Sequence, residues 1–199
     1  VELQAITWEF GEDGDAQGWT TFEGKSSGSL IQSIPRLSSE VRDGVWRIEP
    51  AAFQKNIYPV IQLISPRIGH DSSLFDRVTI RFRLVHTRPL VGGIQLSWTN
   101  MANQDVPGGS PDEGNPENDV LDLRFQYWVP GQTFTTDWQE FTVGDLRSGP
   151  VTQADGRTFD LLWEEELIDF RLEILLNNQE GSGVDGWPEA IEIDRIMLT

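Results

Sequence analysis

The residues best suited to bind a ligand are polar and aromatic side chains that alternate with apolar ones in segments expected to be β-strands. In residues 78–85 (VTIRFRLV) the arginines fall on one face and the apolar residues on the other, because successive side chains of a strand point to opposite faces. Guanidinium and amide groups hydrogen-bond hydroxyls and carboxylates, and an aromatic ring packs on the C–H face of a sugar. This phasing selects seven candidate ligand-binding residues: Arg81, Arg83, Gln95, Arg124, Gln126, Trp128 and Arg171.

Two interpretations of these seven residues stay open. If their strands share a sheet, the side chains line one concave face and form a binding surface for a glycan. Alternatively, each arginine pairs with an acidic residue on a neighbouring strand and only covers an exposed face, at ~0.2–1 kcal/mol per pair. Segments expected to be loops add three aromatic candidates, whose rings would either stack on a sugar or fold back over the core: Tyr58, Trp163 and Trp187.

The sequence offers no recognisable catalytic centre. Its two histidines, His70 and His86, lack metal-ligand spacing, there is no cysteine, and no Gly-x-Ser-x-Gly motif occurs. A glycine-rich phosphate loop before a helix is also missing, which argues against nucleotide binding. No two of the 32 Asp and Glu residues stand out as the carboxylate pair of a glycosidase. We therefore expect no catalytic residues and a protein that is not an enzyme.

Strands must carry these side chains, because apolar residues recur with a period of two and no window of helical length shows a period of three to four. About ten strands in 199 residues predict a single all-β domain over residues 1–199, built as an antiparallel β-sandwich, and a jelly roll satisfies this pattern. The expected strands are residues 6–10, 19–22, 45–49, 60–64, 78–85, 94–99, 120–129, 138–143, 168–176 and 191–198.

Three segments interrupt the strand pattern. Residues 100–119 contain three prolines, three glycines and five acidic residues, and this composition predicts a long acidic surface loop. A loop of this length is often functional or ordered by an ion. The ordinary alternative is a surface excursion without a function. Residues 30–41 are rich in serine and are expected to form another loop, and residues 159–167 are expected to hold one short helical turn.

The net charge of −17 argues against duplex nucleic acid and anionic membranes as general partners. No apolar run approaches the roughly 20 residues of a membrane helix, so no membrane insertion is expected. The sequence starts at Val1 without a signal-like segment, as a mature or excised piece would. The lack of cysteine is compatible with either redox compartment.

Short motifs accompany the strands from one end of the chain to the other. They are ITWEFGEDGDAQGW (6–19), DGVW (43–46), LISP (63–66), FDRVTIRFR (75–83), QLSWTN (95–100), DWQEFTV (137–143), FRL (170–172) and EIDRIML (192–198). Together they resemble bacterial galactose-binding-like jelly rolls of the carbohydrate-binding-module type. The resemblance implies a secreted module that binds a polysaccharide outside the cell or at its surface without cleaving it, and that belongs to a larger protein. The acidic loop departs from the usual pattern.

The resemblance also implies a structural calcium that ties the first strand and the loop after it to the last strand. Carboxylates gathered around the turn at residues 12–15 are the hard oxygen ligands that calcium prefers. The alternative is an Asp-Gly turn whose carboxylates are solvated. The four positions that correspond to the calcium ligands are Glu9, Asp13, Asp15 and Asp194.

A structural role is the alternative function. Residues 1–7 form a strand-like segment that would be free to pair with the exposed sheet edge of another copy. Repeated pairing of this kind would build an extracellular filament, sheath or surface layer from copies of the chain.

Overall fold

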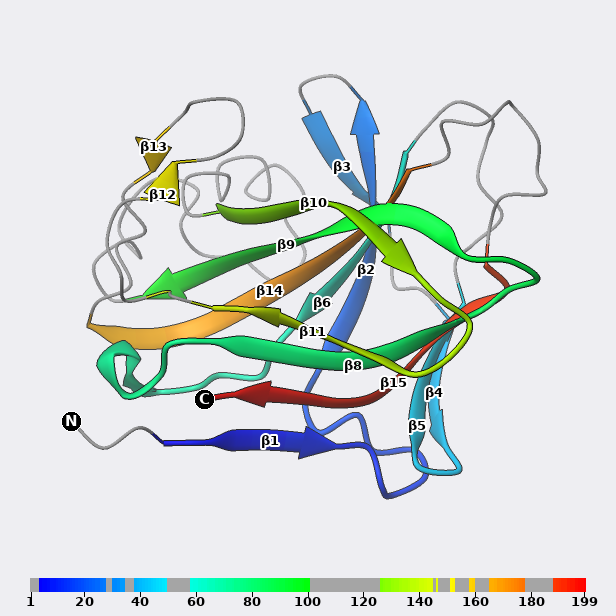
Figure 1. Cartoon of the computed structure of the whole chain (residues 1–199). Coiled ribbons are helices and arrows are strands. Elements are labelled where there is room, and N and C mark those ends of the chain that lie inside the picture. The colour runs from blue at the N-terminus through cyan, green and yellow to red at the C-terminus, as the bar shows by residue number, and fades with distance from the viewer. Residues whose placement is uncertain are drawn as a thin grey trace.

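The strand pattern predicts the architecture correctly, because the described strands pair antiparallel in two sheets that form a sandwich (Figure 1). Sheet A has the order β11 (Gln139–Val143), β8 (Val78–Val85), β15 (Ala190–Leu198), β5 (Val45–Glu49), β4 (Ser38–Arg42), and β1 (Ile6–Glu9) also pairs with β15. A computed structural model describes residues 4–27, 30–34, 38–49, 58–100, 126–144, 146, 151–152, 158–159, 165–177 and 188–199.

Sheet B lies opposite sheet A. Its order is β10 (Gln126–Phe134), β9 (Leu90–Asn100), β14 (Glu166–Asn177), β6 (Tyr58–Ile64), β2 (Thr20–Ser27), β3 (Leu30–Ile34), and β7 (His70–Asp71) also pairs with β14. A short separate ribbon joins β12 (Val151–Thr152) to β13 (Thr158–Phe159), and η1 (Ser72–Leu74) is a single 3-10 turn. None of the described elements is a helix with the length and apolar character needed to cross a membrane.

The hydrophobic core fills the space between the sheets. The predicted inner face of β8 is confirmed, since Val78, Ile80, Phe82 and Leu84 are all buried. At one end the core is aromatic: Trp19 and Phe170 pack edge to face with their ring centroids 5.3 Å apart. Trp8 packs against both rings, and the ring centroids of Phe10 and Trp46 are 5.2 Å apart. Rings in such geometry add to the hydrophobic gain of their burial.

Two β-bulges keep the central strands in phase with the core. In β15 the register shifts between Ile193 and Arg195, so that Ile196 is buried on the same side as Ile193 despite the odd spacing. In β14 the shift lies between Leu167 and Asp169. Strict alternation over residues 168–176 predicts Ile168 in the core, and this prediction is wrong, because the bulge buries Leu167 in its place.

Residues 30–41 were wrongly expected to be a loop. They contain β3 and β4, which form hairpins with β2 and β5. The β4–β5 hairpin turns through Asp43 and Gly44, both with positive φ (52° and 78°), which is the backbone of the tight turn that Asp-Gly favours. The many serines led us to predict a loop, although the Asp43-Gly44 dipeptide predicts the β4–β5 hairpin.

Other expectations concern residues only partly described. Strand β10 continues past Val129 to Phe134, with a register shift between Val129 and Gln132, although we expected it to end at Val129. Strands occupy both ends of residues 159–167, where a helical turn is expected, because Phe159 and Glu166 belong to β13 and β14. The rest of that turn, nearly all of the acidic loop, Arg124, Trp163 and Trp187 lie outside the described residues.

Replacement of Phe170 by alanine is expected to destabilise the domain by about 3–5 kcal/mol, because it leaves a cavity among the rings of the core. Chemical denaturation measures the change. Val91→Ala is the control, since Val91 is 51% exposed and its truncation should cost under about 0.5 kcal/mol. Equal losses in the two variants would contradict this account of the core.

Candidate ligand-binding face

The outer face of sheet B brings together four of the seven predicted ligand-binding residues. Gln95 in β9 is in register with Trp128 in β10, and Arg171 in β14 is in register with Ser97, which pairs in turn with Gln126. These positions form two adjacent rows across three neighbouring strands. Gln95, Gln126, Trp128 and Arg171 therefore meet the condition of a shared sheet, and their role in ligand binding stays a prediction.

The centre of this face is a hydrogen-bonded group that we call the glutamine clamp: Gln62, Glu173 and Gln95. Glu173 in β14 is in register with Gln62 on one side and Gln95 on the other. Gln62 Nε2 donates to Glu173 Oε1 over 2.9 Å, and Gln95 Nε2 donates to Glu173 Oε2 over 2.9 Å. One carboxylate thus joins three strands, and both of its oxygens accept.

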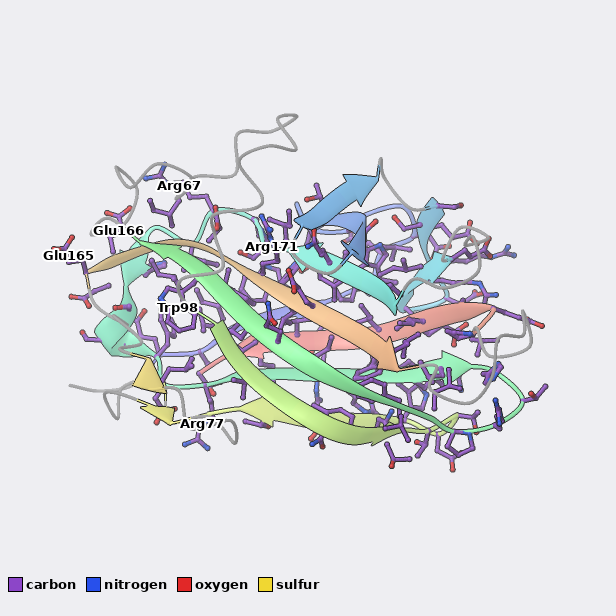
Figure 2. The ribbon with its side chains drawn as sticks, turned by 90° about the horizontal axis from the view of Figure 1, so that it is seen from above. Arg67, Arg77, Trp98, Glu165, Glu166 and Arg171 are labelled. Atoms are coloured by element: carbon purple, nitrogen blue, oxygen red, sulfur yellow. The ribbon has the colours of Figure 1, made fainter. Side chains whose placement is uncertain are left out.

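The clamp is buried although it faces away from the core. The exposed fractions are 1% for Gln62, 3% for Glu173, 5% for the neighbouring Arg171 and 9% for Gln95. A buried carboxylate and guanidinium are costly to desolvate, and a fold keeps such groups only where they are well paired or functional. Figure 2 looks onto this side of the molecule, with Arg171 labelled on β14.

Sequence phasing missed Glu173 and Gln62. Alternation over residues 168–176 places Glu173 on the same polar face as Arg171, but Glu173 was not selected, because acidic residues are common throughout the chain. Gln62 lies in the segment YPVIQLI, which has no clear alternation. The signal that was present is a lone polar residue inside an apolar run, since such a residue needs a partner once it is buried.

Arg81 and Arg83 do not join this face. Both lie in β8 of sheet A, so the condition for one shared surface of all the arginines fails. Arg81 pairs with Asp194 at 2.6 Å, and both guanidiniums stack on Trp138, at 5.3 and 4.7 Å from the ring centroid. For these two arginines the alternative of cross-strand ion pairs is confirmed.

Sheet A has its own central group, which we call the arginine clamp: Arg47, Glu192 and Arg83. Arg47 donates to Glu192 Oε1 over 2.9 Å from β5, and Arg83 Nε donates to Glu192 Oε2 over 2.8 Å from β8. Arg195 also pairs with Glu140 on this face. Each of these arginines has a carboxylate partner, so the outer face of sheet A is covered by ion pairs at these positions.

The four residues predicted to bind calcium make hydrogen bonds or ion pairs within the protein. Asp13 Oδ1 accepts the backbone N–H of Asp43 over 2.9 Å, and Asp15 Oδ1 accepts that of Gln17 over 2.7 Å. Asp194 pairs with Arg81, and the backbone carbonyl of Glu9 accepts from the Gln17 side chain. In the part of the chain that the structure describes, no three Asp, Glu or His side chains converge as a metal site. Calcium binding stays a prediction.

No protein-family model and no curated protein matches the sequence. Among solved structures, the family 11 carbohydrate-binding module of a cellulosomal cellulase from Clostridium thermocellum is similar, with a TM-score of 0.51, 10% identity and coverage of 100% of this chain and 95% of that one. The laminarinase from Rhodothermus marinus has a TM-score of 0.50 at 18% identity, covering 99% and 96% of the two chains. The chain has the jelly-roll fold that these structures share.

A laminarinase from Flavobacterium sp. UMI-01 is similar to the same degree, with a TM-score of 0.51, 12% identity and coverage of 97% and 98%. At these identities the likeness establishes the fold alone. This jelly roll therefore serves both in binding modules and in enzymes, and the predicted fold is confirmed while the activity has to be argued from the residues of the site.

Loss of the Glu192 charge is expected to weaken the jelly roll. Glu192→Gln keeps the shape of the side chain but leaves Arg47 and Arg83 without their shared carboxylate, so we expect a loss of about 1–3 kcal/mol in the free energy of unfolding. Glu49→Gln is the matched control, because the Glu49 side chain is 52% exposed and pairs with Arg47 at the surface. A Glu192 variant as stable as the control would contradict the arginine clamp.

The stability of the jelly roll should also depend on His86. Burial, reinforced by the Arg88 charge, lowers the pKa of His86, although Glu189 acts in the opposite direction. Its Nε2 atom is buried and has no hydrogen-bond partner among the described residues. The unfolded chain therefore takes up this proton first, and His86 destabilises the fold as the pH falls through about 6.5 towards the lower folded value.

Thermal melts between about pH 7.5 and 5.5 should show a smaller loss of stability for His86→Gln than for the wild type. His70→Gln is the control, since it removes the same residue type from an exposed position. A comparison between variants is needed because the many carboxylates of the chain respond to the same acidification. Identical slopes for His86→Gln and His70→Gln would show that the burial of His86 is without effect.

Proposed function

We propose that the jelly roll is a non-catalytic module that binds a polysaccharide on the outer face of sheet B. The observation that supports this proposal most strongly is the glutamine clamp with Arg171 beside it. Amide, carboxylate and guanidinium groups occur there on a sheet face turned away from the core. These groups match the donors and acceptors of sugar hydroxyls.

The sugar would lie over β9 and β10. Gln95 is the most exposed of the four buried polar residues of this face, and Trp128 occupies the register position beside it. A tryptophan at that position provides the aromatic plane that a pyranose ring needs for C–H contacts. Arg171 and Glu173, which are more deeply buried, would support the contact from below.

The carboxylates of this face support binding without hydrolysis. Both oxygens of Glu173 are engaged by the clamp. A carboxylate held in this way is placed to support a polar face rather than to attack or protonate a glycosidic bond.

The similar structures guide the choice of ligand. A family 11 module from Clostridium thermocellum, with a TM-score of 0.50, was solved in complex with a β-1,3-1,4-mixed-linked tetrasaccharide. A soluble mixed-linkage β-glucan and laminarin are therefore suitable first probes. Since such ligands occur outside cells, we propose an extracellular location, and the chain would attach a parent protein or cell surface to the polysaccharide.

Self-assembly through the first residues receives less support. Residues 6–9 already pair with β15, from Ile6 opposite Leu198 to Glu9 opposite Arg195, and Gln4 N–H donates to Leu74 O. The described part of the segment that was expected to be free is therefore occupied within the chain. A strand pair between two copies of the chain would have to form at a strand edge other than the one by which residues 6–9 pair with β15.

Affinity electrophoresis and calorimetry on the mixed-linkage glucan should show binding by the wild type and a loss of about tenfold or more in Trp128→Ala and Arg171→Ala. The matched controls come from sheet A, where Trp138→Ala and Arg81→Ala remove the same residue types from the opposite face. Both controls should bind as the wild type does. Parallel runs with calcium and with a chelator test whether calcium stabilises the module.

Three results would contradict the proposal. The first is a wild type that binds none of the glucans and anionic glycans tested, and the second is a loss of affinity in Trp138→Ala and Arg81→Ala instead. The second result would move the site to sheet A and restore the ligand role predicted for Arg81 and Arg83. Release of reducing ends from either glucan would show that the module is an enzyme.

A further inference from the structure

The glutamine clamp has a defined hydrogen-bond polarity. An ionised carboxylate can only accept, so the group that each glutamine turns towards Glu173 must be its NH₂. The two 2.9 Å contacts run from Nε2 of Gln62 and Nε2 of Gln95. Because the amide is planar, each Oε1 is turned away from Glu173. The carboxylate thereby determines which end of both amides is available to other groups.

A neutral residue at position 173 would not impose this pattern. A glutamine there has one oxygen and one NH₂ group, so it can accept from one neighbour but must donate to the other. The second neighbour would then have to reverse its amide. An isosteric loss of charge at Glu173 therefore changes the donor and acceptor pattern of the face with little change in shape.

We infer that Glu173 is a positioning residue that presents the carbonyl oxygen of Gln95 as an acceptor for ligand hydroxyls. This inference rests on the proposed glycan-binding function. Glu173 is 3% exposed and has both oxygens in use, so it acts through Gln95, which is 9% exposed and lies nearer the surface. The ligand that fits donates a hydroxyl hydrogen bond to the carbonyl oxygen of Gln95.

The first test is independent of any ligand. Heteronuclear NMR of the isotope-labelled chain should place the side-chain NH₂ resonances of Gln62 and Gln95 away from solvent-exposed positions, with protection from exchange. In Glu173→Gln one of the two pairs should shift and lose protection, whereas Glu173→Asp should retain carboxylate acceptance for at least one glutamine. Unchanged NH₂ resonances in Glu173→Gln would overturn the inference.

The second test measures affinity for the mixed-linkage glucan. Glu173→Gln should bind about tenfold to 100-fold more weakly than the wild type, since an acceptor of the site becomes a donor. Glu192→Gln is the matched control, because it removes the same charge from the arginine clamp in the opposite sheet and should leave the affinity unchanged. A general loss of stability would weaken both variants, whereas a positioning role weakens only the first.

The outcomes separate this inference from the function on which it rests. If the wild type binds the glucan and Glu173→Gln binds equally well, the positioning role is wrong and the glycan site stands. If the wild type binds no glycan, both proposals fail, whatever the amide resonances show. If Glu173→Gln and Glu192→Gln lose affinity equally, the effect of Glu173 is one of stability, and the inference is wrong.

Discussion

Each sheet has one outward-facing glutamate at its centre whose carboxylate joins three strands. Glu192 in β15 accepts hydrogen bonds from arginines in β5 and β8, and Glu173 in β14 accepts hydrogen bonds from glutamines in β6 and β9. A shift of a glutamate strand by one residue would turn its carboxylate into the core, and a shift of a partner strand would turn the arginine or glutamine away, so that in either case the carboxylate loses a partner. The two clamps therefore tie the register of the sandwich to its polar side chains as well as to its core.

The two clamps differ in what holds the carboxylate. In sheet A the partners are arginines, and the same face adds further ion pairs and the stacking of Arg81 and Arg83 on Trp138. In sheet B the glutamines of the clamp are neutral amides, and Arg171 lies on the same face two residues away along β14. The first arrangement pairs a carboxylate with cations, whereas the second brings amide, carboxylate and guanidinium groups together on one face.

The sequence predicts the sandwich well because period-two alternation depends only on local geometry, as β8 and β5 demonstrate with the bounds expected for them. It fails where one residue changes the phase, as at the bulge that buries Leu167, and where serines conceal a hairpin, as in β3 and β4. The candidate site was predicted in part. Phasing places Arg81 and Arg171 equally well on polar faces, but strand order in space decides that they belong to opposite sheets, and no local pattern encodes that order.

The central claim is that the glycan contacts sheet B over the glutamine clamp and leaves sheet A untouched. Heteronuclear NMR of the wild type, titrated with the β-1,3-1,4-linked tetrasaccharide, tests it most directly. The account predicts saturable shifts in the side-chain amides of Gln95 and Gln62 and in the backbone of β9, β10 and β14, with no shift in the Trp138 indole N–H or the Arg81 and Arg83 side chains. Shifts confined to Trp138 and those arginines would contradict it.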